Sequence, residues 1–228
     1  MQADQNETTM KKNSICYLLL LMMAVFTMAS CSEDSGEVEE FADWQHKNET
    51  YFAQLHAATQ ERIAKGDQNW KIIRNWSLPA DGQNFHADLN NYIIVHVLEC
   101  GNSTSGSPLY TDSVMVNYRG RLIPSATYTA GYLFDRSYSG AYNPQTMNPA
   151  KFAVSGLVDG FTTALLHMSV GDRWEVYIPY KLGYGTEKAP KSEIPGYSTL
   201  IFDIGLAGYY RPKAPTRAGV ASGSWIKK

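Results

Sequence analysis

The chain is poor in the groups that most enzymes use for acid–base or metal chemistry. It has three cysteines and five histidines, and the histidines are scattered rather than grouped at metal-ligand spacing. There is no Gly-x-Ser-x-Gly elbow, no phosphate-binding glycine loop and no His-Glu-x-x-His motif. We therefore expect no metal and no other cofactor, and we interpret each histidine as a surface or structural residue.

The chain also has no large excess of positive or negative charge, since the formal net charge is −2. Nucleic-acid-binding proteins usually carry a strongly basic face, so we expect no nucleic-acid partner. The charges are unevenly placed, with acidic residues between Glu33 and Glu40 and basic residues between Arg211 and Lys228. Both runs are typical of solvated tails rather than binding surfaces.

The apolar run Tyr17–Met28 follows the charged Met10-Lys-Lys12 and is too short for a comfortable membrane span. It predicts a secretory signal. Met28-Ala-Ser-Cys31, where small residues precede a cysteine, resembles the lipobox of bacterial lipoproteins, in which the cysteine is acylated. The alternative is ordinary cleavage near Ser30 that leaves Cys31 free. We expect a cell-envelope protein anchored through Cys31 to the outer membrane, on its periplasmic or its surface face.

Cysteine use agrees with this interpretation better than with a disulfide scaffold. Cys16 leaves with the signal and Cys31 carries lipid, so Cys100 has no partner for a bridge. His96 lies four residues from Cys100 on a predicted strand, about 13 Å along it, which argues against Cys100 as a nucleophile. We expect the hydrophobic core to supply the stability.

Val38 to Ala64 contains neither proline nor glycine, and Gly66 follows where a helix could stop. The loosely helical spacing of its apolar residues predicts one amphipathic helix; these are Phe41, Trp44, Tyr51, Phe52, Leu55 and Ile63. Its apolar face could pack on the following domain or on another chain. We favour the first and expect a monomer.

Residues rich in β-branched and aromatic side chains predict two strands, Trp70–Trp76 and Asn91–Leu98, separated by the turn-prone segment Pro79–Asn84. After a polar turn at Gly101–Pro108, the alternation of Val114, Val116 and Tyr118 predicts a strand that places these three side chains on one face.

The period changes at Leu157–Met168, where apolar residues three and four apart predict a short helix. Alternating apolar residues predict two more strands, through Trp174, Val176 and Ile178 and through Leu200, Phe202 and Ile204. Both strands could pack on that helix, so the fold class is α+β. We divide the chain into a signal with lipobox (1–31), an acidic tether with the start of the helix (32–45), an N-terminal extension of helix plus strand (46–90), a main domain (91–208) and a flexible basic tail (209–228).

One set of aromatic and aliphatic residues has no role in acid–base chemistry: Tyr118, Phe134, Phe152, Leu157, Val158, Phe161, Tyr184 and Phe202. From the residues alone, the set is equally well explained as core or as the lining of an apolar site.

Six blocks in order decide between these explanations: Ser113–Gly120, Leu133-Phe-Asp135, Gly156–Phe161, Trp174–Pro179, Gly183-Tyr-Gly185 and Thr199–Asp203. Together they resemble the FKBP-type peptidyl-prolyl isomerases, the macrolide-binding immunophilins, over about Asn91–Gly208. The resemblance implies a strongly twisted antiparallel sheet wrapped around one short helix, here with an N-terminal helical extension. It implies proline-containing polypeptides as partners and a macrolide as a second ligand.

Carried onto matching positions, the resemblance implies that Tyr118, Phe134 and Asp135 line one side of a pocket, with Phe161 at its base. Tyr184 would line the loop side and Phe202 the far wall, and the backbone N–H of Val158 would donate to a substrate carbonyl. Leu157, Phe152 and Ile194 are the further substrate-binding residues implied. Asp135 either positions a tyrosine or an arginine or caps a turn, and the tyrosines could instead be core residues.

Three departures from the family pattern bear on ligand binding. Phe161 stands where Trp is frequent, Ala150 stands where a pocket aromatic is common, and the segments Arg121–Tyr132 and Arg136–Pro149 are longer and rich in tyrosine. These segments either select substrates or lie across the pocket. Two alternatives to an efficient isomerase remain: a catalytically weak binding or chaperone-like lipoprotein of the same fold, and a structural surface lipoprotein with a vestigial pocket.

Overall fold

The computed structural model describes residues 39–79, 88–190, 192–212 and 223–227. Glu40–Lys228 form one compact unit. The predicted signal, Cys31 and the acidic tether up to residue 38 lie outside the described residues, as do most of the predicted turn Pro79–Asn84 and residues 213–222 of the predicted tail. No helix in the described part of the chain is long and apolar enough to cross a bilayer.

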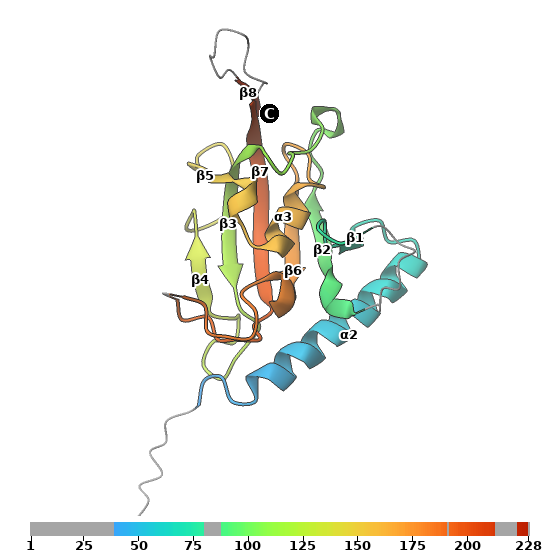
Figure 1. Ribbon diagram of the computed structural model, residues 1–228, viewed down its shortest axis with the longest axis vertical. Helices are drawn as coiled ribbons and strands as arrows, with labels where there is room; N and C mark the ends of the chain where they lie inside the picture. The colour runs from blue at the N-terminus through green and yellow to red at the C-terminus, as the bar shows by residue number, and fades with distance from the viewer. Residues whose placement is uncertain (1–38, 80–87, 191, 213–222, 228) are drawn as a thin grey trace, which may run out of the picture. The chain divides into compact units, whose positions relative to one another are not determined.

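The fold is α+β, as the sequence predicts, and is built on one antiparallel eight-stranded sheet (Figure 1). The strand order is β1-β2-β6-β7-β3-β4, with β5 also paired to β3 and β8 also paired to β7. The strands are β1 Trp70–Arg74, β2 Tyr92–Glu99, β3 Ser113–Arg121, β4 Leu133–Arg136, β5 Ala150–Ala153, β6 Arg173–Ile178, β7 Leu200–Pro212 and β8 Gly223–Lys227.

The described helices are α2 Trp44–Ala64 and α3 Asp159–Leu165, with short 3₁₀ turns η1 Leu89–Asn91, η2 Ser103–Ser105, η3 Val154–Gly156 and η4 Tyr180–Leu182. We call the side of the sheet that packs on α3 the inner face, and the opposite side the outer face. Val114, Val116 and Tyr118 share the inner face as predicted, and all three are buried. Figure 1 shows α3 lying across the middle of the sheet.

Close packing of α3 on the sheet depends on Gly160. A Cβ atom at this position would lie 2.3 Å from a side-chain methyl carbon of Ile178, so a larger residue would push the helix off β6. The helix is shorter than the predicted Leu157–Met168. Leu157 and Val158 are extended, and His167 and Met168 continue through tighter bonds to residues three positions earlier.

Helix α2 begins at Trp44 rather than Val38, because Asp43 has a left-handed backbone (φ 52°) that interrupts helical geometry. It packs within the chain, as expected. The Trp44 indole N–H donates to Ser198 Oγ at 2.8 Å, and Asn48 Oδ1 accepts the Thr199 N–H at 2.7 Å. The packed face is more polar than predicted, since it includes the buried Asn48, His56 and Thr59 beside Trp44 and Phe52, while Ile63 is exposed.

The prediction of a flexible tail from residue 209 is wrong for the residues described there. Strand β7 runs on to Pro212, with Tyr209 buried and paired to Val114, and β8 pairs with β7 over Gly208–Pro212. The proline, alanine, glycine and serine residues of this region are typical of a loop, although it contains a short strand with Trp225 and Ile226. The first predicted strand also ends earlier, at Arg74 rather than Trp76.

Candidate functional site

Aromatic rings from four strands and α3 meet on the inner face. Tyr118 lies 5.7 Å from Phe152, 6.3 Å from Phe161 and 6.4 Å from Phe202, measured between ring centroids. Phe202 lies 5.0 Å from Phe161 and 5.4 Å from Phe134, both edge to face. Edge-to-face pairs at these separations are favourable beyond the apolar area they bury. The structure therefore brings together five of the predicted site residues; we call these five rings the ring cluster.

The ring cluster is partly covered. Tyr118, Phe161 and Phe202 are at most 8% exposed, whereas Phe134 and Phe152 are half-buried. The cluster thus combines a buried floor with a partly accessible rim, and aromatic side chains of this kind line apolar ligand sites.

Asp135 lies on β4 beside Tyr118. The Tyr118 hydroxyl donates to Asp135 Oδ2 at 2.7 Å, and Asp135 Oδ1 accepts the N–H of Arg136 at 2.8 Å. Burial raises the pKa of Tyr118, and the hydrogen bond to Asp135 and its negative charge raise it further. The phenol therefore stays neutral. Of the two roles expected for Asp135, positioning a tyrosine is the one that the geometry supports.

Two residues without a predicted role hold Tyr118 and the rings in register. Ser137 is bonded to both backbone groups of Tyr118: its Oγ accepts the Tyr118 N–H at 2.9 Å, and its N–H donates to the Tyr118 carbonyl at 2.9 Å. At Gly120, a Cβ would lie 2.6 Å from ring atoms of both Phe134 and Phe202. A glycine inside a strand signals such a close approach; nothing in the sequence marks Ser137.

Leu157 and Val158 lie between η3 and α3, half-buried and packed against the hydrophobic core. Val158 is the N-cap residue of α3, with an extended backbone (φ −62°, ψ 148°). No acceptor among the described residues takes its N–H, although its carbonyl accepts from Thr162 at 3.0 Å. The position agrees with the predicted donor role, which stays a prediction.

The two remaining predicted residues come from the segment between η4 and β7. Tyr184 is 44% exposed, and its pKa is raised by partial burial and by the charge of Asp135, which places its phenol within electrostatic reach of the Tyr118–Asp135 pair. Ile194 is 2% exposed and belongs to the same core cluster as Phe161 and Phe202. Tyr184 is thus an accessible group beside the site, while Ile194 lies in the core.

The long segment after β4 does not cover the ring cluster with its tyrosines. Tyr138 Oη donates to Asp203 Oδ2 at 3.2 Å, and the Tyr142 ring lies 4.1 Å from the Arg173 guanidinium. Asp203 and Arg173 point to the outer face, because they alternate with the inner-face residues Phe202 and Trp174. Of the two expectations for this segment, lying across the pocket is wrong for Tyr138 and Tyr142.

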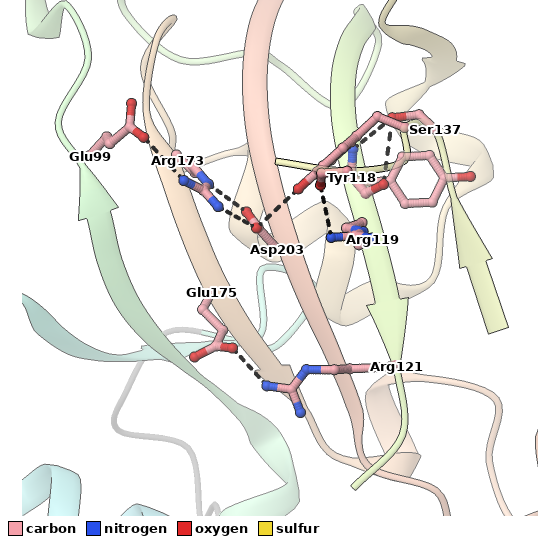
Figure 2. A network of polar contacts seen from close by, with 10 residues as sticks. Glu99, Tyr118, Arg119, Arg121, Ser137, Arg173, Glu175 and Asp203 are labelled. Atoms are coloured by element: carbon pink, nitrogen blue, oxygen red, sulfur yellow. Dashed lines mark hydrogen bonds and ion pairs between the residues drawn. The ribbon is translucent and has the colours of Figure 1, made fainter. Parts of the chain in front are cut away.

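Figure 2 shows the outer-face network around Arg173 and Asp203, the residues that these tyrosines contact. Arg173 bonds both oxygens of Asp203, at 2.9 and 2.7 Å, and also Glu99 at 3.2 Å. Arg121 pairs with Glu175 at 2.8 Å nearby. Hydrogen bonding to Asp203 raises the pKa of Arg173, so the guanidinium stays charged. Neither acid–base chemistry nor substrate contact is required to explain this network, which joins β2, β6 and β7.

Within the described residues, no group of three or more histidine, cysteine or acidic side chains could hold a metal ion. The site consists of rings, aliphatic side chains, one neutral phenol bonded to a carboxylate, and a backbone N–H at Val158 without an acceptor among the described residues. Such an arrangement can bind an apolar, planar group and desolvate it.

Comparison with known proteins gives a match to one family. Residues 105–207 match the family of FKBP-type peptidyl-prolyl cis-trans isomerases, and this range contains every predicted site residue except Cys31. The chain is 39% identical over 99 residues to the FKBP-type 22 kDa peptidyl-prolyl cis-trans isomerase of Escherichia coli K12, covering 43% of this chain and 42% of that protein. It is 36% identical over 118 residues to the peptidyl-prolyl cis-trans isomerase Mip of Coxiella burnetii, covering 52% of this chain and 45% of that protein.

The chain thus spans less than half the length of these two curated relatives. Among solved structures, a peptidyl-prolyl cis-trans isomerase of Pseudomonas syringae pv. tomato matches with a TM-score of 0.46 and 25% identity, covering 71% of this chain and 90% of that one. The FkpA protein of Escherichia coli matches with a TM-score of 0.42 and 25% identity, covering 89% of this chain and 88% of that one.

Proposed function

We propose that this chain, whose residues 105–207 match the FKBP-type peptidyl-prolyl cis-trans isomerase family, rotates Xaa-Pro peptide bonds at the ring cluster. The observation that carries the proposal is the convergence of Tyr118, Phe134, Phe152, Phe161 and Phe202 around an accessible rim, with the Tyr118 hydroxyl fixed by Asp135. The substrates are proline-containing polypeptides, and a macrolide is the expected inhibitor.

An apolar site suits this reaction for a physical reason. The planar amide is polar because of resonance, and rotation about C–N removes that resonance against a barrier of about 18–20 kcal/mol. The twisted amide separates less charge than the planar one. A desolvated apolar site therefore disfavours the planar ground state relative to the twisted transition state. Each tenfold acceleration needs only about 1.4 kcal/mol of such a difference.

Individual residues divide the work. Phe161 and Phe202 provide the buried floor for the proline ring, and Phe134 and Phe152 provide its rim. The Val158 N–H, without an acceptor among the described residues, donates to the carbonyl of the substrate. Tyr118 remains a neutral phenol, so its ring contributes apolar contact while Asp135 fixes its orientation.

The test is an NMR exchange or protease-coupled assay of the full chain on Ala-Xaa-Pro-Phe peptides, with and without a macrolide inhibitor. We expect catalysis that the macrolide abolishes. Tyr118→Phe should lower kcat/KM about tenfold, because about 1.4 kcal/mol of positioning through Asp135 is lost. Tyr128→Phe makes the same chemical change at an exposed tyrosine and should leave kcat/KM unchanged.

A folded chain without catalysis would overturn the isomerase proposal. The same sample titrated with the peptide would then separate the two alternatives, since a binding or chaperone-like module retains peptide affinity and a vestigial site does not. Catalysis without inhibition would keep the enzyme and indicate that the wall thinned at Ala150, or the longer segments, exclude the macrolide.

We further propose that the mature protein is a monomer anchored to the outer membrane through acylated Cys31. The sequence Met28-Ala-Ser-Cys31 after an apolar run supports this proposal. Metabolic labelling with a radioactive fatty acid should mark the wild type and the Cys16→Ala control, and Cys31→Ala should remove the label. An unlabelled wild type would favour ordinary cleavage near Ser30, and label that persists in Cys31→Ala would show that Cys31 is not the acylated residue. Protease treatment of intact cells distinguishes the two membrane faces, and sedimentation tests the monomer.

A further inference from the structure

The outer face carries a cavity of about 690 Å³ on the side of the sheet away from the ring cluster. Its floor is the sheet, through Met115 of β3 and Ala207 of β7, and one wall is the segment 142–149. Lys227 of β8 closes the other side. Met115 alternates with the inner-face residues Val114 and Val116, which fixes the cavity on the outer face.

A second hollow of about 410 Å³ adjoins it. Lys151 of β5 lines both, and the second hollow adds the aromatic side chains of Tyr210 and Trp225. Trp225 is 38% exposed, and its ring centroid lies 5.5 Å from that of Tyr210. Because Lys151 lines both, we treat the two hollows as one groove, from the segment 142–149 to the Tyr210–Trp225 pair, and call it the outer groove.

The groove is positively charged at its centre. Lys151 Nζ lies 5.5 Å and Lys227 Nζ 5.8 Å from the Trp225 ring, so both ammonium groups are held over one aromatic side chain. Neither lysine has a carboxylate partner among the described residues. The acidic group in the lining, Glu99, is already paired with Arg173. The unmatched charge of the groove therefore favours an anionic ligand.

Tyr142 fixes the wall of the groove to the sheet. Tyr142 lies between the cavity and the sheet, with its ring 4.1 Å from the Arg173 guanidinium. A Cβ at Gly205 would lie 2.1 Å from the Tyr142 hydroxyl, so the glycine at this position is what lets the tyrosine seat on β7. The outer-face network of Figure 2 thus fixes the base of this wall. A wall fixed before binding lowers the entropic cost of ordering a ligand.

Strand β5 joins the outer groove to the ring cluster. Phe152 contacts Tyr118 on the inner face, while its neighbour Lys151 alternates to the outer face and lines both hollows. An extended polypeptide covers about 3.3–3.6 Å per residue, so a few residues are enough to pass from one side of this four-residue strand to the other.

We propose that the outer groove binds an acidic segment of the same polypeptide whose proline occupies the ring cluster. The inference rests on the proposed isomerase function, which makes a proline-containing polypeptide the ligand, and on Lys151 and Lys227, which favour an acidic segment of it. The wall formed by the segment 142–149 favours an extended chain, which can lie along it, over a flat lipid surface. Two lysines on a chain of net charge −2 are too few for nucleic acid. Binding at both sites makes the second contact intramolecular and raises the affinity for clients that carry both features.

The first experiment tests the groove without any isomerisation. A fluorescein-labelled, proline-free peptide of sequence Gly-Glu-Tyr-Glu-Leu-Glu-Gly is titrated into the full chain at low salt, and a Lys-for-Glu version serves as the peptide control. We expect the acidic peptide alone to bind, and more weakly at 0.5 M salt because exposed charges are screened. The variant Lys151→Glu/Lys227→Glu should weaken binding about tenfold or more. Lys47→Glu/Lys65→Glu, which makes the same charge change on and just after α2, should not.

The second experiment links the two sites. On a short Ala-Leu-Pro-Phe peptide, Lys151→Glu/Lys227→Glu should isomerise as fast as the wild type. On the same peptide extended by the acidic segment, the variant should lose the gain in kcat/KM that the wild type shows.

Absence of binding by the acidic peptide, or equal binding by the Lys-for-Glu peptide, overturns the groove proposal even if the enzyme is active. Binding without catalysis by a folded chain would instead leave the groove and reject the isomerase. Circular dichroism and Tm establish that each variant is folded, and Trp225→Phe, which keeps an aromatic ring, should bind the acidic peptide within about threefold of the wild type.

Discussion

Replacing Gly120 by alanine should damage the site more than the fold. The added Cβ would lie 2.6 Å from a ring atom of Phe134 and 2.6 Å from one of Phe202. Carbon atoms in contact prefer about 3.5–4.0 Å, so the two rings must move apart by about 1 Å. Overpacking of this kind typically costs about 1–3 kcal/mol, which leaves a domain of ordinary stability folded.

The catalytic effect should be larger than this loss implies. A displacement of about 1 Å at a positioned group can cost on the order of 10²-fold in rate, so we expect kcat/KM on Ala-Leu-Pro-Phe peptides to fall by roughly 10- to 100-fold. The Tm should fall by about 2–12 °C, from about 2–4 °C per kcal/mol at this chain length. Assays at 10 °C, far below the transition, separate the two effects.

Gly156→Ala is the matched control, because a Cβ at Gly156 would meet nothing within 4 Å. It lies in η3, close in sequence to Leu157 and Val158, and we expect its activity and Tm to stay near those of the wild type. If Gly120→Ala lowers Tm but keeps kcat/KM within twofold of the wild type, the rings of Phe134 and Phe202 serve packing alone and our assignment of the site is wrong.

Two further predictions concern stability. Asn48→Ala should lower the free energy of unfolding by about 1–3 kcal/mol, because the buried Thr199 N–H loses its acceptor. Gln45→Ala, at an exposed position of the same helix, should change it little. Urea unfolding of both variants measures these changes, and equal effects would contradict the role of Asn48. Burial, with the charge and hydrogen bond of Asp203, raises the pKa of Tyr138 to about 12, so the stability from the neutral phenol is present below pH 10 and is lost between pH 10 and 12. Urea midpoints at pH 8, 10.5 and 11.5 should therefore fall more steeply for the wild type than for Tyr138→Phe, and parallel curves would show that Tyr138 does not contribute.

Much of the inner face could be predicted from the sequence, because burial on one side of a strand leaves a two-residue period. Val114, Val116 and Tyr118 illustrate this, and Leu157–Met168 reveals α3 by its different period. The partners of each ring could not be obtained from periodicity, since they depend on strand order. The family resemblance alone placed these rings in one site, and the ring contacts in the structure are consistent with that placement.

The outer face was harder to predict because its contacts join residues far apart in the chain. Arg173 and Asp203 are thirty residues apart, and only the pairing of β6 with β7 makes them neighbours. The same limit applies to β8, whose five residues become a strand only because the end of β7 offers unpaired backbone groups. Ser137, which fixes both backbone groups of Tyr118, has no local pattern that distinguishes it from a turn serine.

Where the compact unit begins, Glu40 is fastened to the segment between β3 and β4. Its carboxylate accepts hydrogen bonds from the hydroxyls of Ser125 and Thr127, and these bonds lower its pKa. A pulling force applied to the chain before residue 40 therefore acts first on this carboxylate and then on the Trp44–Ser198 hydrogen bond. The segment that Glu40 binds connects β3, which contains Tyr118, to β4, which contains Asp135. Such a force would thus act close to Tyr118 and Asp135 before it reaches the rest of the sheet.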